Sequence, residues 1–171
     1  MEFARAAVSL RFPNGGELKI GGNYVPVVRH GEAIYVSGEI PRVGDTIAVT
    51  GRAGSDVTVA QAQWAAKICI LRALSLLKAS LGSLSQVQSV MRMTVIIQCA
   101  QDFTQHSEVA DGASELLYAV MGPVGVQTRT SLGAYRLPKN ATVEVDLVAA
   151  SIVPVGARDS QAQPGNRPND A

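Results

Sequence analysis

The sequence predicts an α+β protein in which two helices cover one face of a mixed, mostly antiparallel sheet. Two segments repeat apolar residues every three or four positions, as amphipathic helices do. Around them lie short runs rich in β-branched residues, separated by turn signals. The expected order is strand, strand, a short strand, helix, strand, helix, strand, strand.

The first half of the chain opens the sheet. Residues 24–30 and 33–40 read as two strands joined by a tight turn, which is a hairpin signal. Residues 41–56 are expected to be a loop with a short strand at 47–50. The first helix follows, with Asp56 or Thr58 as its N-cap and Gly82 as its stop. Its apolar stripe comprises Val59, Ala62, Ala66, Cys69, Ala73, Leu77 and Leu81.

The second half alternates strand and helix signals. Residues 84–99 are rich in β-branched side chains, which favour a strand. A second helix is expected at 104–121, where Gly122 and Pro123 stop it. The stretch QTRTSLGAYRLPKNATVEVDLVAAS, residues 127–151, reads as two strands joined by a turn.

Length and composition indicate a single domain with a proper core. Of 171 residues, 47% are hydrophobic and 17% charged. We expect this domain over residues 1–153, with an irregular segment at 1–20 and a flexible tail at 154–171. Arg72 and Lys78 interrupt the most apolar segment, so no membrane span is expected. The N-terminal residues lack the apolar core of a signal peptide, which favours a cytoplasmic location.

Two cysteines, Cys69 and Cys99, show neither CxxC spacing nor a nearby histidine cluster. We therefore expect no metal and no other cofactor. Buried free thiols in a reducing cytoplasm are favoured, while a disulfide stays open because the sequence does not fix the distance between the two.

The last two expected strands raise a question about charge. A tight hairpin centred on 138–139 would place Ser131 opposite Asp146, and would put Arg129 on the same face as Glu144. The arginine could neutralise these carboxylates, or its planar fork could bind a substrate carboxylate. The polar face would be either solvated or covered by another subunit.

Three pieces of sequence carry a resemblance to a known family. YVSGEIP (35–41), RTSLGAYRLPKNATVEVDLVA (129–149) and Tyr24 resemble the Rid/YjgF family of reactive-intermediate deaminases, also called endoribonuclease L-PSP or translation-inhibitor proteins. The likeness runs from Gly21 to Ser151. It implies a chorismate-mutase-like fold and a homotrimer, with the non-helical sheet faces around the threefold axis and ligand clefts between adjacent subunits.

The resemblance also implies an enamine/imine deaminase. In active members, the arginine matching Arg129 binds the carboxylate of an acid such as 2-aminoacrylate; water adds, ammonia leaves and a 2-keto acid forms. Glu144 would position the water, Tyr24 would close over the ligand, and backbone groups at Ser131 would hydrogen-bond the amino nitrogen. The other positions that match the family's ligand-binding residues are Ser37, Gly38 and Asp111.

Three positions depart from the family pattern. Ser131 stands where many deaminases have cysteine, Glu39 where glutamine is common, and Asp111 where asparagine is usual. The two carboxylates add negative charge near a site meant for an anion, which indicates a different substrate or a lost deaminase activity.

Two further functions therefore stand beside the deaminase. One is a non-catalytic, regulatory trimer that binds a small carboxylate metabolite. The other is an endoribonuclease-type translation inhibitor, which is disfavoured because 15 Lys and Arg face 14 Asp and Glu, leaving little electrostatic attraction for nucleic acid.

Overall fold

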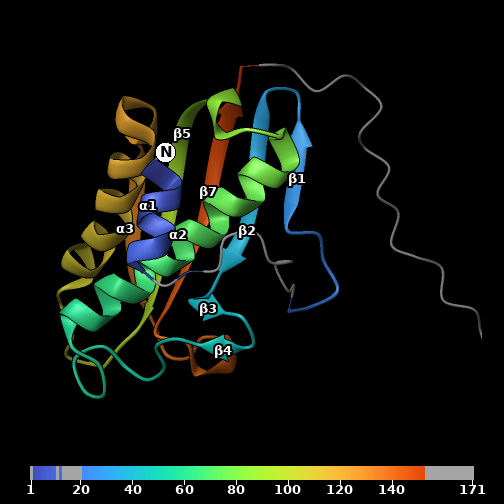
Figure 1. The fold of residues 1–171 in the computed structure, drawn as a ribbon. Helices are drawn as coiled ribbons and strands as arrows, with labels where there is room; N and C mark the ends of the chain where they lie inside the picture. The colour runs from blue at the N-terminus through green and yellow to red at the C-terminus, as the bar shows by residue number, and fades with distance from the viewer. Residues whose placement is uncertain (1, 11, 13–20, 153–171) are drawn as a thin grey trace, which may run out of the picture.

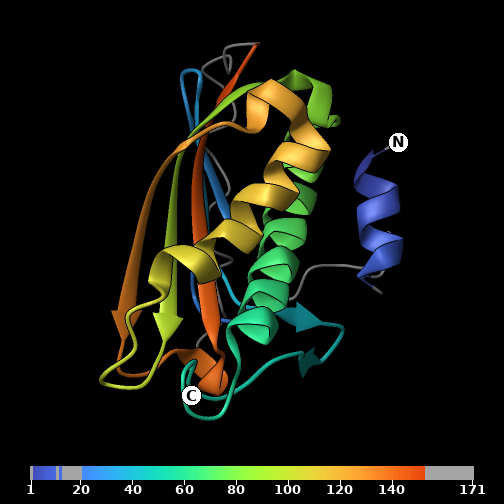
Figure 2. The same ribbon diagram turned by 90° about the vertical axis from the view of Figure 1, so that its left-hand side faces the viewer.

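The computed structural model describes residues 2–10, 12 and 21–152. Helices α2 (Val59–Leu81) and α3 (His106–Met121) lie across one face of a five-stranded sheet (Figure 1). A third helix, α1 (Glu2–Ser9), packs on the outer side of these two and does not reach the sheet (Figure 2). The predicted α+β class is confirmed, with three α-helices rather than two among the described residues.

The sheet has the strand order β1-β2-β7-β5-β6. All its neighbouring pairs are antiparallel except β5 and β6, which run parallel because α3 carries the chain back between them. The bounds are β1 (Val27–His30), β2 (Ala33–Glu39), β5 (Val87–Gln98), β6 (Thr128–Ala134) and β7 (Val143–Ser151).

The expected first hairpin is confirmed as β1–β2. A separate small ladder joins β3 (Arg42–Val43) to β4 (Thr46–Ile47). This ladder overlaps the short strand expected at 47–50 at a single residue, Ile47.

The hairpin expected within residues 127–151 is wrong. Strand β5 lies between β6 and β7 and pairs with both. A turn of 3₁₀ helix, Pro138–Asn140, lies in the connection from one flank of β5 to the other. The pairing follows from α3, which delivers β6 parallel to β5 on its outer side and leaves the inner side to β7. The side chains of β6 therefore occupy other faces than predicted, whereas those of β7 do not.

Helix α2 begins and ends where the sequence predicts. Thr58 is the N-cap: its side chain accepts from the backbone N–H of Gln61, whose side chain accepts from the backbone N–H of Thr58 in return. Gly82 at the C-terminus has φ +79°, a left-handed conformation that glycine adopts at little cost. Most of the helix is buried between the sheet, α1 and α3.

Helix α1 corrects the expectation of an irregular segment at 1–20 for residues 2–9, whereas residues 1, 11 and 13–20 lie outside the described part of the chain. Eight residues are too short for a stable isolated helix, so tertiary contacts must hold it. Ala7 is fully buried, and the Lys78 ammonium of α2 lies 5.9 Å from the centre of the Phe3 ring. The tail expected at 154–171 lies outside the described residues.

The sheet presents two different faces. Its helix-covered face is apolar along most of β7, where Val143, Val145 and Leu147 are buried. No described element covers the opposite face, which carries Glu144 and Asp146 and leaves Tyr35 half exposed. Among the described residues, no helix combines the length and apolar character that crossing a membrane requires.

Candidate functional site

A cavity of about 380 Å³ opens where β2 ends beside the start of β7. It brings together four residues that the family resemblance had singled out: Tyr24, Ser37, Gly38 and Glu144. The rest of its lining is Gly21, Glu39, Ile40, Arg42, Arg72, Pro138 and Lys139. Its volume suits a small metabolite.

A β-bulge shapes this cavity. Val36 pairs with Leu147 and Glu39 with Val145, so two residues of β2, Ser37 and Gly38, oppose one residue of β7. The backbone N–H of Ser37 donates to Pro26 at 2.9 Å, and its hydroxyl donates to the carbonyl of Val25 at 3.0 Å. The bulge therefore anchors the segment that carries Tyr24, whose side chain is 49% exposed at the cavity.

Glu144 lies directly against Gly38. A β-carbon at position 38 would collide with the Glu144 carboxylate, so glycine is needed there for close approach. Burial raises the pKa of the Glu144 carboxyl above its usual value, and the nearby carboxylates of Asp146 and Glu39 raise it further. Glu144 can therefore hold a proton at a higher pH than an ordinary glutamate.

Beneath the cavity lies a buried ion pair. The bulge turns Glu39 toward the helices, where its carboxylate accepts from Nε of Arg72 at 2.6 Å. Arg72 also donates to the backbone carbonyl of Arg42 at 3.3 Å. Burial raises the pKa of Glu39, although both arginines oppose that shift. The charge of Glu39, which the sequence predicts to oppose an anionic ligand, thus has a buried partner, Arg72, that sequence reasoning missed.

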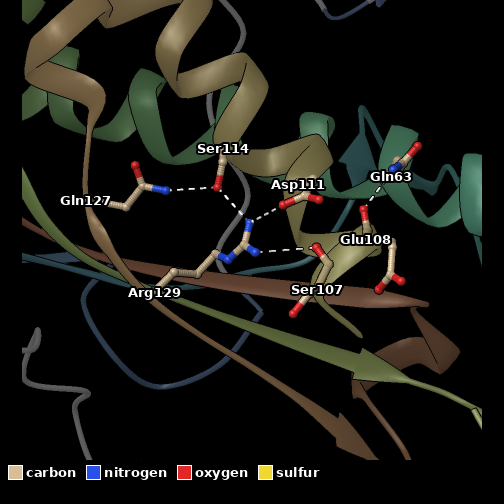
Figure 3. A network of polar contacts seen from close by, with 7 residues as sticks. All are labelled: Gln63, Ser107, Glu108, Asp111, Ser114, Gln127 and Arg129. Carbon is tan, nitrogen blue, oxygen red and sulfur yellow. Dashed lines mark hydrogen bonds and ion pairs between the residues drawn. The ribbon is translucent and has the colours of Figure 1, made fainter. Parts of the chain in front are cut away.

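Arg129 lies elsewhere, at the edge strand β6 beside α3 (Figure 3). One terminal nitrogen donates to the Asp111 carboxylate and to the Ser114 hydroxyl, both at 2.9 Å; the other donates to the carbonyl of Ser107 at 3.4 Å. Gln127 donates to the same Ser114 hydroxyl at 2.9 Å. Asp111, at the family's asparagine position, is therefore an ion-pair partner of the arginine.

The guanidinium of Arg129 keeps some binding capacity. Three of its five N–H groups are used, so Nε–H and one terminal N–H carry no hydrogen bond within the described residues. Its side chain is 21% exposed. Ser131, two residues along β6, is half-buried on the same, helix-covered face.

Arg129 and Glu144 do not share a face, contrary to the prediction. Arg129 pairs with Met93 of β5, which in turn pairs with Leu147 of β7, and all three lie on the helix-covered face. Glu144 aligns with Ile96 on the open face. Two strand spacings and three residues separate them, which places their Cα atoms about 14 Å apart. One chain therefore presents two separate groups: the cavity at Glu144 and the network at Arg129.

A second cavity, of about 550 Å³, lies near the ends of β5 and β6 and was not predicted. The Cys99 thiol lies 3.6 Å from Nε2 of His106, and Gly133 packs so closely over both that a β-carbon there would collide with them. Arg52 stacks on Tyr135 with its guanidinium carbon 4.6 Å from the ring centre. Burial raises the pKa of the Cys99 thiol.

Both cysteines are free, as favoured from the sequence. Cys69 is fully buried in α2, whereas Cys99 is partly exposed.

Comparison with known proteins agrees with this architecture. The family described as "YjgF/chorismate mutase-like, putative endoribonuclease" matches residues 5–151. Protein TCP17 of Trypanosoma cruzi is 39% identical over 125 residues, which are 72% of this chain and 78% of that protein.

Two solved structures resemble the chain closely. The Agrobacterium tumefaciens protein Atu1372 is 36% identical with a TM-score of 0.79, over 89% of this chain and 94% of that one. A protein from Shewanella oneidensis MR-1, described as a putative endoribonuclease, is 26% identical with a TM-score of 0.80, over 88% and 99%. The likeness noted from the sequence motifs is thereby confirmed, and the chain belongs to the YjgF/chorismate mutase-like family, also known as Rid/YjgF.

Proposed function

We propose that the protein is a hydrolase that deaminates small enamine or imine acids to 2-keto acids, with its sites formed between subunits of a homotrimer. The observation that carries the proposal is the separation of two complementary groups on one chain. The cavity offers a carboxyl with a raised pKa and an exposed tyrosine, while β6 offers a guanidinium with unused donors.

Assembly would bring these groups together. Glu144 lies on the open sheet face, and Arg129 lies at the sheet edge next to that face. A neighbouring subunit packed against the open face would place its own Arg129 edge beside the cavity of the first. The exposed apolar side chains of the open face, Tyr35 and Leu132 among them, would be covered by the same contact.

The reaction needs only weak general acid–base catalysis because an iminium carbon is already electrophilic. The unused N–H groups of Arg129 would hold the substrate carboxylate and fix the orientation of the C=N bond. Glu144, in its ionised form, would take a proton from the attacking water, forming the C–O bond. It would return that proton to the amino group and then accept the proton of the new hydroxyl as the C–N bond breaks, so that the C=O bond forms and ammonia leaves. A raised pKa suits a carboxyl that both accepts and donates.

Keto-acid release is the decisive measurement. A serine dehydratase would generate 2-aminoacrylate in place, and pyruvate formation would be followed with and without the protein. We expect acceleration by the wild type and its loss in Arg129→Ala and in Glu144→Gln. Arg5→Ala is the matched control, because Arg5 is an exposed arginine of α1 far from both groups. Sedimentation of the wild type would test the trimer.

The outcomes separate the alternatives. Absence of acceleration, with acetate or pyruvate still bound in an Arg129-dependent manner, would reject the deaminase in favour of the carboxylate-binding regulatory trimer. Equal acceleration by wild type and Arg129→Ala would reject the assigned site. Since both thiols are free, we expect these activities in a reducing compartment such as the cytoplasm.

An endoribonuclease is the alternative suggested by the family description. The near-neutral net charge of +1 gives it little electrostatic support. RNA cleavage that disappears in Arg129→Ala would favour it over the deaminase.

A further inference from the structure

The cavity at Glu144 contains one more buried cation than the proposed reaction needs. Arg42 and Arg72 are 8% and 5% exposed, and the buried carboxylate between them, Glu39, is 6% exposed. Arg72 makes the direct ion pair with Glu39. Arg42 also attracts Glu39, but one carboxylate balances only one of two guanidiniums, so this group keeps one buried positive charge in excess, which is costly.

The backbone of Arg42 is held in place by several hydrogen bonds. Its backbone N–H donates to the carbonyl of Ile40 at 2.7 Å, its carbonyl accepts from Arg72, and it pairs with Ile47 in the small β3–β4 ladder. Its Nε is buried and has no hydrogen-bond partner among the described residues. A buried arginine with an unused donor, lining a cavity, is suited to binding an anion.

Two further charged residues line the cavity, Lys139 and Glu144. Lys139, held at φ +56° in the turn before β7, adds a further exposed positive charge to the lining. Burial and the carboxylates of Asp146 and Glu39 raise the pKa of Glu144, which favours its neutral form. The described lining is thus biased toward a negatively charged group.

We propose that the cavity receives the second acidic group of a dicarboxylic 2-imino acid, with Arg42 as its main contact and Lys139 at the rim. This inference rests on the proposed function, in which Arg129 of the neighbouring subunit holds the carboxylate next to the imine. The two arginines would then bind the two carboxylates at opposite ends of the substrate, with Glu144 between them. The substrate class is a five-carbon or similar dicarboxylate rather than the short monocarboxylates expected from the sequence.

Binding of unreactive analogues tests the inference without any catalysis. Glutarate and pentanoate have the same carbon count and differ in the second carboxylate. By calorimetry at pH 7.5, we expect glutarate to bind wild type about tenfold more tightly or better, since hydrogen bonds to charged groups are strong. Arg42→Gln should abolish this preference while leaving pentanoate binding unchanged.

Arg29→Gln is the matched control. Arg29 also has a buried Nε without a partner among the described residues, but it lies outside the cavity lining. It should leave the preference intact, and thermal unfolding would confirm that both variants are folded. Equal affinity of wild type for the two acids, or a preference that survives Arg42→Gln, would overturn the inference.

A kinetic arm keeps this inference distinct from the proposed function. D-Aspartate oxidase acting on D-glutamate supplies 2-iminoglutarate, and D-amino acid oxidase acting on D-norvaline supplies 2-iminopentanoate. A tenfold higher kcat/KM for the former, lost in Arg42→Gln, supports the inference. Deamination of both imines with equal kcat/KM leaves the deaminase standing and refutes the dicarboxylate preference. Arg42-dependent glutarate binding without any deamination supports the anion site and refutes the deaminase.

Discussion

Gly112, in the middle of α3, offers the sharpest test of the packing. Two effects of replacing it by alanine change the free energy of unfolding in opposite directions. In an ordinary helix interior, replacing glycine by alanine stabilises by about 1 kcal/mol. Here the added β-carbon would meet the backbone carbonyl oxygen of Gln63, in α2, at 2.6 Å and its Cα at 2.8 Å. Backbone atoms cannot swing away as the end of a side chain can.

The magnitude follows from that distance. Ordinary contacts begin near 3.4 Å, so α2 and α3 would have to separate by roughly 0.8 Å at this point. Overpacking of this kind costs about 2–3 kcal/mol, which exceeds the gain in helix propensity. We therefore expect Gly112→Ala to lower the free energy of unfolding by about 1–2 kcal/mol, and the Tm by about 4 °C.

Urea unfolding followed by circular dichroism would measure the change. Gly21→Ala is the control, because a β-carbon there meets no atom within 4 Å; its stability should stay within about 0.5 kcal/mol of wild type. A Gly112→Ala variant more stable than wild type would refute the reasoning, since helix propensity would then outweigh the contact between the two helices.

Three further predictions concern charge and reactivity. Asp111→Asn should tighten acetate binding about two- to fivefold at low salt, because the exposed ion pair with Arg129 competes with the ligand; unchanged affinity by calorimetry would contradict this. Asp146→Asn should move the acid limb of the kcat/KM profile to lower pH, since the pKa of Glu144 falls when that neighbouring negative charge is removed and Glu144 then stays ionised in more acidic solution; an unmoved limb would argue against Glu144 as the base. Cys99 should react with iodoacetamide more slowly than free cysteine at pH 7.5, because burial raises its thiol pKa; a faster rate, followed by mass spectrometry, would show activation by the adjacent imidazole.

Local patterns were enough to predict the helices of the core. The apolar stripe, Thr58 and Gly82 located α2 because capping and periodicity act within a few residues. Helix α1 was missed because its stability comes from packing on α2 and α3, which its own eight residues do not reveal.

The sequence-based prediction failed mainly in which distant strands pair with each other. The turn at Pro138 resembles a hairpin turn, yet β5, about 40 residues earlier, takes the place between β6 and β7. No local feature of residues 127–151 encodes that insertion. The consequence was an incorrect face for Arg129, although Glu144 was placed correctly.

The candidate site was predicted in part. Family motifs identified Tyr24, Ser37, Gly38 and Glu144, which the fold brings together. Arg72 was treated only as an interruption of an apolar segment. A charged residue inside a buried helix face requires a partner, so Arg72 could have been sought opposite an acidic strand residue.

Glu39 was the partner, but strict alternation along β2 hides it. Ile34 and Val36 face the helices, so Glu39 would face the other way in a regular strand. The bulge reverses that alternation, and no local feature of the sequence predicts the bulge.

The bulge at Ser37 and Gly38 also bears on how this strand tolerates insertions and deletions. Removing one of the two residues would convert the bulge into an ordinary pair and still leave Glu39 opposite Val145. Losing or gaining a residue elsewhere in β2 would turn inward side chains outward on one side of the change. This strand therefore has one position at which homologous chains can differ in length by a residue and keep the same core.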